Sequence, residues 1–142
     1  MVIAGSAGPL RFAMVSDTHV GVARPASAAR LSQVYEAIAG LAPDFVLHCG
    51  DVTDTGLAEE YDLYQRAVPA ALRGRIRHVP GNHDVRWDPT AKGHYQAYYG
   101  AAPYSFDAGG IHFAGFDLTQ PLLEPGHCGP ACLLYTSDAA DE

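Results

Sequence analysis

Apolar residues gather in two short runs, at residues 10–16 and 45–49, and two stretches with helical spacing follow them. After the second of these stretches, residues 75–79 are predicted to form a third strand. Short apolar runs that end in polar or small residues indicate buried strands. In residues 26–40 and 57–72, apolar side chains recur every three or four positions, which predicts two amphipathic helices. The order of strand, helix, strand, helix and strand favours an α/β fold with a parallel sheet and right-handed crossovers.

Local signals indicate where the two helices begin and end. Ser27 can cap the first helix, and Gly40 can end it. Pro69 has no backbone N–H to donate, so it can kink or end the second helix, and Gly74 stops that segment.

The pattern changes after the third strand. Residues 86–103 contain aromatic residues among Gly and Pro, so we expect a long connection with one short helix near Tyr95. Residues 104–107 and 111–116 flank an Ala-Gly-Gly sequence at 108–110, which predicts a tight antiparallel hairpin. The expected fold class is therefore α/β, with a mostly parallel first sheet followed by a β-hairpin.

The composition resembles that of soluble globular proteins. Of the 142 residues, 48% are apolar and 18% are charged, and the length suits one domain with one core. No apolar run approaches the roughly 18 residues that a membrane span needs. Residues 1–9 contain no signal-peptide pattern. We therefore expect a cytoplasmic protein with no membrane segment.

The net charge bears on nucleic-acid binding, and the cysteines bear on zinc binding and thiol chemistry. The net charge is −7 and the arginines are scattered along the sequence, so nucleic acid is an unlikely partner. The cysteines, Cys49, Cys128 and Cys132, show no Cys-x-x-Cys zinc spacing. Cys49 lies in an apolar run, so we expect a buried, reduced thiol there.

Polar clusters follow all three predicted strands. Residues 17–19 read Asp-Thr-His, residues 50–54 read Gly-Asp-Val-Thr-Asp, and residues 80–84 read Pro-Gly-Asn-His-Asp. In an open parallel sheet, ligands bind at the carboxyl ends of the strands. The three clusters are therefore expected to converge on one edge of the sheet.

The residue types in these clusters suit metal ions. Carboxylate and amide oxygens together with imidazole nitrogens fit Mn, Fe or Zn. In an extended segment, Asp17 and His19 point to the same side and can reach one ion. Asp51 can bridge two ions through its two carboxylate oxygens. The alternative is that these Asp and His side chains only cap loops.

The order Asp-x-His, Gly-Asp, Gly-Asn-His-Asp resembles that of the calcineurin-like metallophosphoesterase superfamily, over roughly residues 10–119. The resemblance implies an αββα sandwich of two sheets flanked by helices, of which this chain forms the N-terminal part. It also implies two divalent ions. Asp17 and His19 bind the first ion, Asp51 bridges both, and Asn82 binds the second.

The same resemblance implies roles at the phosphate. His83 assists the reaction, and Asp84 orients His83. The implied activity is hydrolysis of a phosphodiester or phosphomonoester by a hydroxide that bridges the two ions. The substrate is then a small phosphorylated molecule such as a phosphodiester or a nucleotide. Alternatives are a nuclease of the same superfamily and a non-catalytic metal-binding or scaffold member.

Two segments are similar to the bacterial cyclic-nucleotide phosphodiesterase branch, namely residues 50–54 and 109–117. Purple acid phosphatases have a tyrosine ligand where this chain has Asp54. This difference counts against membership of the purple acid phosphatase branch.

The later motifs of the superfamily, a single His and then Gly-His-x-His, do not occur in the sequence.

Residues 132–142 resemble one reading frame of a sequencing adapter, so we expect natural sequence beyond about residue 131 to be missing. We therefore assign residues 1–131 to a partial domain and 132–142 to an adapter-derived tail. Without the tail's three acidic residues the net charge changes from −7 to −4. A natural acidic tail is the alternative.

A partial domain is expected to bind metal weakly and to turn over little substrate. The other histidines are not expected to complete the site. We expect His48, His78 and His112 to be packed or hydrogen-bonded, and His94 and His127 to be solvated in loops.

The aromatic residues that follow the third cluster are Trp87, Tyr95, Tyr98 and Tyr99. They could line a substrate pocket, although ordinary packing is the simpler interpretation. Arg86 could approach a phosphate or lie on the surface.

Overall fold

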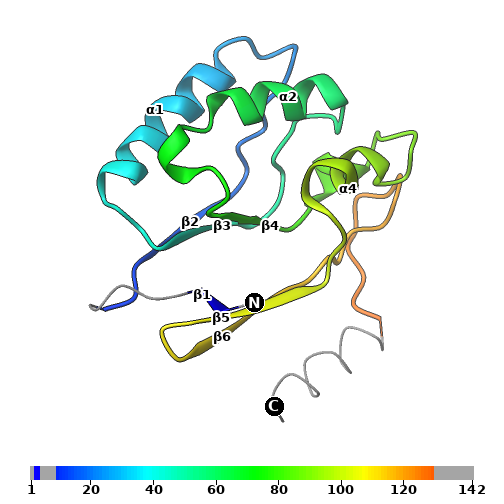
Figure 1. Ribbon diagram of the computed structural model, residues 1–142. Coiled ribbons are helices and arrows are strands. Elements are labelled where there is room, and N and C mark those ends of the chain that lie inside the picture. Colours follow the sequence, from blue (N-terminus) through cyan, green and yellow to red (C-terminus); the bar gives the residue numbers. More distant parts are fainter. Residues whose placement is uncertain (1, 4–8, 130–142) are drawn as a thin grey trace.

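Three parallel strands form the first sheet, as predicted. In the computed structural model, which describes residues 2–3 and 9–129, the strands β2 (Phe12–Val15), β3 (Phe45–His48) and β4 (Ile76–His78) pair in the order β2-β3-β4 (Figure 1). The expected adapter-derived tail lies outside the described residues.

Helices cover one face of this sheet (Figure 1). They are α1 (Ser27–Gly40), α2 (Ala58–Ala67) and the short 3-10 helix η1 (Ala70–Leu72). The second predicted helix ends before Pro69, as the missing N–H of proline requires. Among the described helices, none combines the length and apolar character needed to cross a membrane.

The prediction that Ser27 caps α1 is wrong. Ala26 holds the cap position and makes no side-chain cap bond. The Ser27 hydroxyl instead donates to the Arg24 carbonyl at 2.6 Å and accepts from the Gly21 N–H at 3.2 Å. The serine therefore braces the loop before the helix, because its position one residue inside the helix lets it reach back.

A second sheet forms the other layer. Strand β5 (Tyr104–Ala108) pairs antiparallel with β6 (Ile111–Gly115) and parallel with the short β1 (Val2–Ile3). Gly109 and Gly110 connect the hairpin, and their φ values of 57° and 78° are those of a type I′ turn. Between β4 and β5 lie α3 (Asn82–Val85) and α4 (Gly93–Tyr99).

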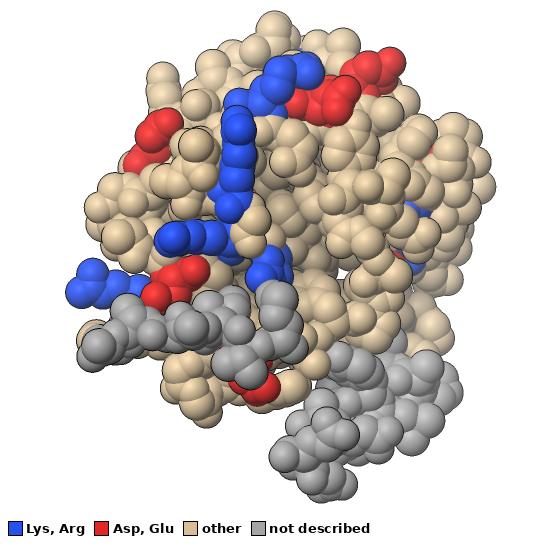
Figure 2. Space-filling view, in the orientation of Figure 1, with Lys and Arg blue, Asp and Glu red and all other residues tan. Residues whose placement is uncertain are grey.

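Arginines gather on one face although they are scattered in the sequence. Figure 2 shows Lys and Arg side chains over the part of the molecule that carries α2 and β4. Arg73 and Arg75 are exposed and Arg77 is half-buried. Their guanidinium groups donate to backbone carbonyls within this region.

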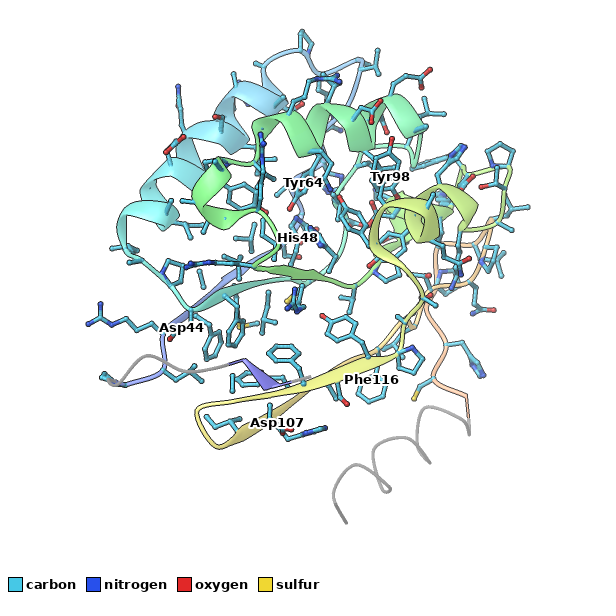
Figure 3. All side chains as sticks on the ribbon, viewed as in Figure 1. Asp44, His48, Tyr64, Tyr98, Asp107 and Phe116 are labelled. Atoms are coloured by element: carbon cyan, nitrogen blue, oxygen red, sulfur yellow. The ribbon has the colours of Figure 1, made fainter. Side chains whose placement is uncertain are left out.

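The main core lies between the first sheet and the helices. Buried tyrosines dominate it, and their rings meet the histidines of β3 and β4: these residues are Tyr35, Tyr61, Tyr64, His48 and His78. Tyr64 and His48 approach each other from α2 and β3 (Figure 3). A smaller cluster packs Phe45 against Phe106 and Phe113 between the two sheets.

Cys49 is exposed, which corrects the prediction of a buried thiol. Side chains alternate along a strand, so Cys49 faces away from the layer that buries His48. The described second sheet covers Phe45 on that face but leaves Met14 66% exposed. An apolar run indicates a strand without showing how far each face is covered.

The histidine predictions are confirmed for the two strand residues and for His112 and His127, but not for His94. His112 is bonded to the Asp107 carboxylate at 2.8 Å, and His127 is exposed. His94 lies in α4, where its Nδ1 donates to the Gly56 carbonyl at 2.9 Å. It is therefore held in place and not solvated in a loop.

His48 is buried and His78 is half-buried, and both rings are neutral. Thr18 Oγ1 donates to the Val52 carbonyl at 2.8 Å, so it accepts from His48 Nε2 at 3.1 Å, and the buried His48 Nδ1 has no hydrogen-bond partner among the described residues. Burial lowers the pKa of His48 to about 4. Burial, with nearby His48 and Arg77, also lowers the pKa of His78 well below its usual value.

We expect stability to fall in mild acid because of these two rings. Their folded-state pKa values lie below the unfolded value of about 6.5, so the stabilisation is complete above pH 6.5 and is lost as the pH falls. The free energy of unfolding should drop by up to about 1.4 kcal/mol per pH unit for each ring.

Urea unfolding in EDTA between pH 7.5 and 5 measures how steeply the free energy of unfolding falls with pH. His78→Gln should reduce the slope, whereas the exposed control His112→Gln should not. Unfolding energies that do not vary with pH would contradict the assignment.

Candidate metal centre

Backbone hydrogen bonds join the loops after β2 and β3. The N–H groups of Asp17 and His19 donate to the carbonyls of Gly50 and Asp51 at 3.0 and 3.1 Å. The N–H of Val20 continues the series to the Val52 carbonyl at 3.1 Å. The parallel pairing thus extends beyond the strands and fixes the two loops side by side.

Three of the expected metal ligands adopt a left-handed backbone conformation. The φ values are 57° at Asp17, 41° at His19 and 53° at Asp51. Such a conformation costs a non-glycine residue about 1–3 kcal/mol and persists where surrounding contacts enforce it. We predicted an extended segment at residues 17–19. The side chains of Asp17 and His19 do meet, but through left-handed backbone at both residues and not through strand alternation.

Side-chain donor atoms converge at these loops. His19 Nε2 lies 3.7 Å from Asp17 Oδ1 and 3.8 Å from Asp51 Oδ2. The three donor atoms all lie within 4.8 Å of one another. Asp51 is nearly buried at 9% exposure, while Asp17 is open to solvent. Two carboxylates and one imidazole form a donor set that suits Mn, Fe or Zn.

The loop after β4 closes over Asp51. Gly81 packs so tightly against the Asp51 backbone and carboxylate that any side chain there would clash. The His83 N–H donates to Asp51 Oδ1 at 2.9 Å. Asn82 is the first residue of α3 and precedes His83 directly, so the third predicted cluster joins the other two.

Asp54 also belongs to the site, although from the sequence we used it only to exclude the purple acid phosphatase branch. Its Oδ1 lies 3.7 Å from His19 Nδ1 and 3.9 Å from His83 Nδ1. His19 Nδ1 is buried and makes no hydrogen bond with any described residue. A metal-binding histidine commonly directs its second nitrogen to a carboxylate. His19 and Asp54 therefore fit a metal held at His19 Nε2. The spacing Gly-Asp-x-x-Asp was the available signal.

His83 stands between the metal ligands and an exposed aromatic side chain. Its ring lies 4.4 Å from that of His19 and 5.0 Å from that of Trp87. Its Nδ1 is 2.8 Å from the Asp54 carbonyl, and because a carbonyl only accepts, Nδ1 carries the proton. The neutral ring therefore has its lone pair at Nε2.

The expectation that Asp84 orients the His83 ring is wrong. The Asp84 carboxylate is completely buried and faces the β3 loop. It accepts from the N–H groups of Gly81, Val52 and Thr53 at 2.9–3.1 Å and from the Thr53 hydroxyl at 2.9 Å. Burial raises the pKa of Asp84, and these hydrogen bonds oppose the rise. Asp84 thus positions loops, and the Asp54 carbonyl orients the ring.

The aromatic residues after this loop divide into two groups. Tyr95 is buried in the core, where the Tyr99 ring packs against it. The rings of Tyr98 and Tyr99 both pack against Tyr61. Trp87 is 45% exposed beside His83. Arg86 lies over the Trp87 ring at 4.7 Å and pairs with Glu124 at 3.1 Å.

A cleft of about 510 Å³ opens beside Asp17 and His19, and its wall includes Arg24 and Arg30. Arg24 is also paired with Asp54 at 3.1 Å. Cations at the rim of an otherwise acidic centre favour an anionic ligand.

Asp54→Asn should weaken Mn²⁺ or Zn²⁺ binding by about 10–100-fold, because His19 loses the carboxylate that supports it. Titration calorimetry on the metal-free protein measures the change. Glu36→Gln, which removes the same charge from the exposed face of α1, serves as the matched control and should leave the affinity unchanged. Equal affinities for Asp54→Asn and the unsubstituted chain would exclude this role.

Asp84→Asn should lower the free energy of unfolding by about 3 kcal/mol, because an amide nitrogen would replace one acceptor among several donors. Urea unfolding gives the value, with the exposed Asp107→Asn as control. The His83 tautomer, followed by ¹⁵N NMR, should stay Nδ1–H. A changed tautomer at unchanged stability would restore the ring-orienting role.

Comparison with known families agrees with this geometry. A family model described as calcineurin-like phosphoesterase matches residues 10–131, which contain the whole centre. A search of curated proteins gives no significant match. The family consists of phosphoesterases that bind divalent metals, which confirms the superfamily prediction. This chain belongs to the calcineurin-like phosphoesterase family.

Proposed function

We propose that the protein is a phosphoesterase with two divalent metal ions, held by Asp17, His19, Asp51 and Asn82. The observation that carries this proposal is that a carboxylate oxygen of Asp17 and one of Asp51 both lie within 3.8 Å of His19 Nε2. Their separation permits one ion to contact all three. Gly81 and His83, which flank Asn82, contact Asp51 where the β3 and β4 loops meet, and this supports our assignment of the second ion to Asp51 and Asn82.

Bound divalent ions supply an acidified water and neutralise charge on phosphoryl oxygens. The chain's own groups add the remaining steps. His83 Nδ1–H is held by the Asp54 carbonyl, so Nε2 is the atom that takes up or releases a proton. A protonated Nε2 can donate to the leaving oxygen of the ester. His83 is therefore the general acid in our proposal.

We further propose a small phosphodiester or nucleotide as substrate and a cytoplasmic location. Support for the substrate comes from the cleft beside Asp17 and His19, where Arg24 and Arg30 can face a negatively charged group. Trp87 is exposed next to His83 and offers a flat apolar surface for an organic leaving group. Similarity of residues 50–54 and 109–117 to cyclic-nucleotide phosphodiesterases favours a diester.

Hydrolysis of bis(p-nitrophenyl) phosphate with added Mn²⁺ tests the function. Because we propose that residues 1–131 are a partial domain, a chain carrying the natural sequence that would follow is assayed beside the 142-residue chain, for which we expect weak metal binding and little turnover. Asp51→Asn should lower kcat/KM at least about a thousandfold, because it removes charge from the proposed bridging ligand.

The exposed Asp107→Asn is the control and should retain full activity. Metal binding without hydrolysis by either chain would favour the non-catalytic alternative. Activity that survives Asp51→Asn would exclude the proposed centre.

A further inference from the structure

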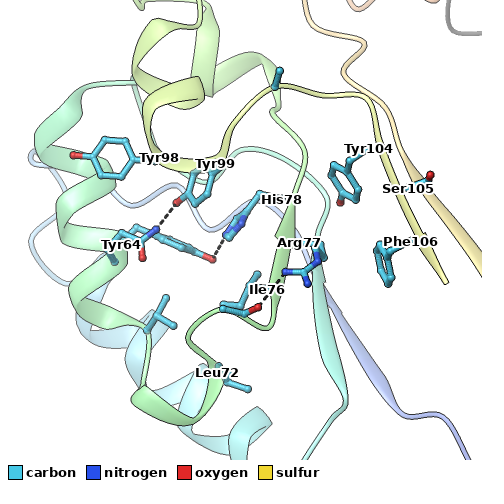
Figure 4. A pocket seen from close by; sticks show the side chains of 14 residues that line it. Tyr64, Leu72, Ile76, Arg77, His78, Tyr98, Tyr99, Tyr104, Ser105 and Phe106 are labelled. Carbon is cyan, nitrogen blue, oxygen red and sulfur yellow. Dashed lines mark hydrogen bonds between the residues drawn. The ribbon is translucent and has the colours of Figure 1, made fainter. Parts of the chain in front are cut away.

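A second cavity lies at the outer edge of β4, apart from the metal centre. Its volume is about 450 Å³, which falls in the range of small-molecule pockets. The rings of His78, Tyr98 and Tyr99 lie on one side, and those of Tyr104 and Phe106 on the other (Figure 4). None of the proposed metal ligands lines it. Its walls are therefore aromatic and independent of the site described above.

The backbone of β4 presents polar groups to this cavity. The Arg75 carbonyl accepts from Val46 and the Val79 N–H donates to His48, so the odd-numbered residues of this segment bond to β3. In a parallel pair, the residues between them direct N–H and C=O groups to the other side. Ile76 and His78 therefore offer donors and acceptors at an edge with which no described strand pairs.

Arg77 places a positive charge between the two aromatic walls (Figure 4). Its guanidinium donates to the Gly74 carbonyl at 3.1 Å and lies 5.6 Å from the centre of the Phe106 ring. Among the described residues, no carboxylate forms an ion pair with it. A half-buried guanidinium with free donors and no acidic partner favours an anion such as phosphate or carboxylate.

The histidine in the wall is held by its neighbours. His78 Nε2 is hydrogen-bonded to the Tyr64 hydroxyl at 3.0 Å, and its ring stacks with Tyr99 at 3.9 Å and with His48 at 5.6 Å. These contacts hold this wall of the cavity in place. Binding a planar ligand there would cost little side-chain entropy.

We propose that this cavity binds a planar aromatic ligand with an anionic group, of the size and chemistry of a mononucleotide. The ring of the ligand lies against the aromatic walls, and its polar edge meets the outward N–H and C=O groups of β4. The anionic group binds Arg77. This site goes beyond the proposed hydrolysis and needs no metal.

Titration of the 142-residue chain with AMP tests the proposal. The experiment is done in EDTA and repeated with Asp51→Asn, so that the metal centre contributes nothing and the proposed function can fail separately. We expect saturable binding by ligand-observed NMR and calorimetry. Adenosine and inorganic phosphate should each bind at least about tenfold more weakly than AMP, because each satisfies only half of the site.

Two variants locate the binding. Arg77→Gln should weaken AMP binding at least about tenfold. Arg75→Gln, the matched control, removes an exposed arginine that does not line the cavity and should have little effect. Ser105→Trp should block the cavity while leaving Arg77 in place. Circular dichroism confirms that each variant folds.

Several outcomes would overturn the proposal. They are no saturable AMP binding, equal losses in Arg77→Gln and Arg75→Gln, and AMP binding that survives Ser105→Trp. Inorganic phosphate that binds as tightly as AMP would also overturn it, because the aromatic walls would then contribute nothing.

Discussion

One buried carboxylate holds the metal centre together. Asp84 accepts hydrogen bonds from the β3 loop through Val52 and Thr53 and from the β4 loop through Gly81. The hydroxyl of Tyr61 on α2 adds a contact at 3.3 Å. A buried carboxylate is stable only when such donors surround it, so its burial and the positions of the loops depend on each other. The two loops that carry Asp51 and Asn82 cannot separate without exposing this network.

Contacts within the chain therefore arrange the centre. Backbone bonds from the β2 loop to the β3 loop hold Asp17, His19 and Asp51 in left-handed conformations that would otherwise be unfavourable. Gly81 approaches Asp51 so closely that only a residue without a side chain fits at this point of the third loop. Carboxylates held close together repel one another, and a divalent ion relieves that repulsion. The rigid scaffold thus favours metal binding by fixing the ligands near one another.

Periodicity and turn chemistry predicted the strands, the break at Pro69 and the Gly-Gly hairpin, because these depend on local rules. The convergence of the three polar clusters followed from the carboxyl ends of parallel strands. Errors arose where partners come from distant segments. The roles of Asp84 and Asp54 depend on which groups face them from loops 32 and 29 residues away in the sequence. The exposure of Cys49 depends on how far a second sheet extends over one face. A local sequence pattern predicts neither the roles of these carboxylates nor the exposure of Cys49.

The two edges of β4 illustrate how one strand can serve two sites. Its odd-numbered residues bond to β3 and set the direction of the chain into Asn82 and His83 at the metal centre. The backbone groups of Ile76 and His78 face the opposite edge, where Arg77 and the aromatic walls meet. A net charge of −7 concealed this basic region, since charge averaged over a sequence cannot show that arginines gather in space. Within the described residues β4 pairs only with β3, so the ligand that we propose can meet its outer edge without disturbing the metal ligands.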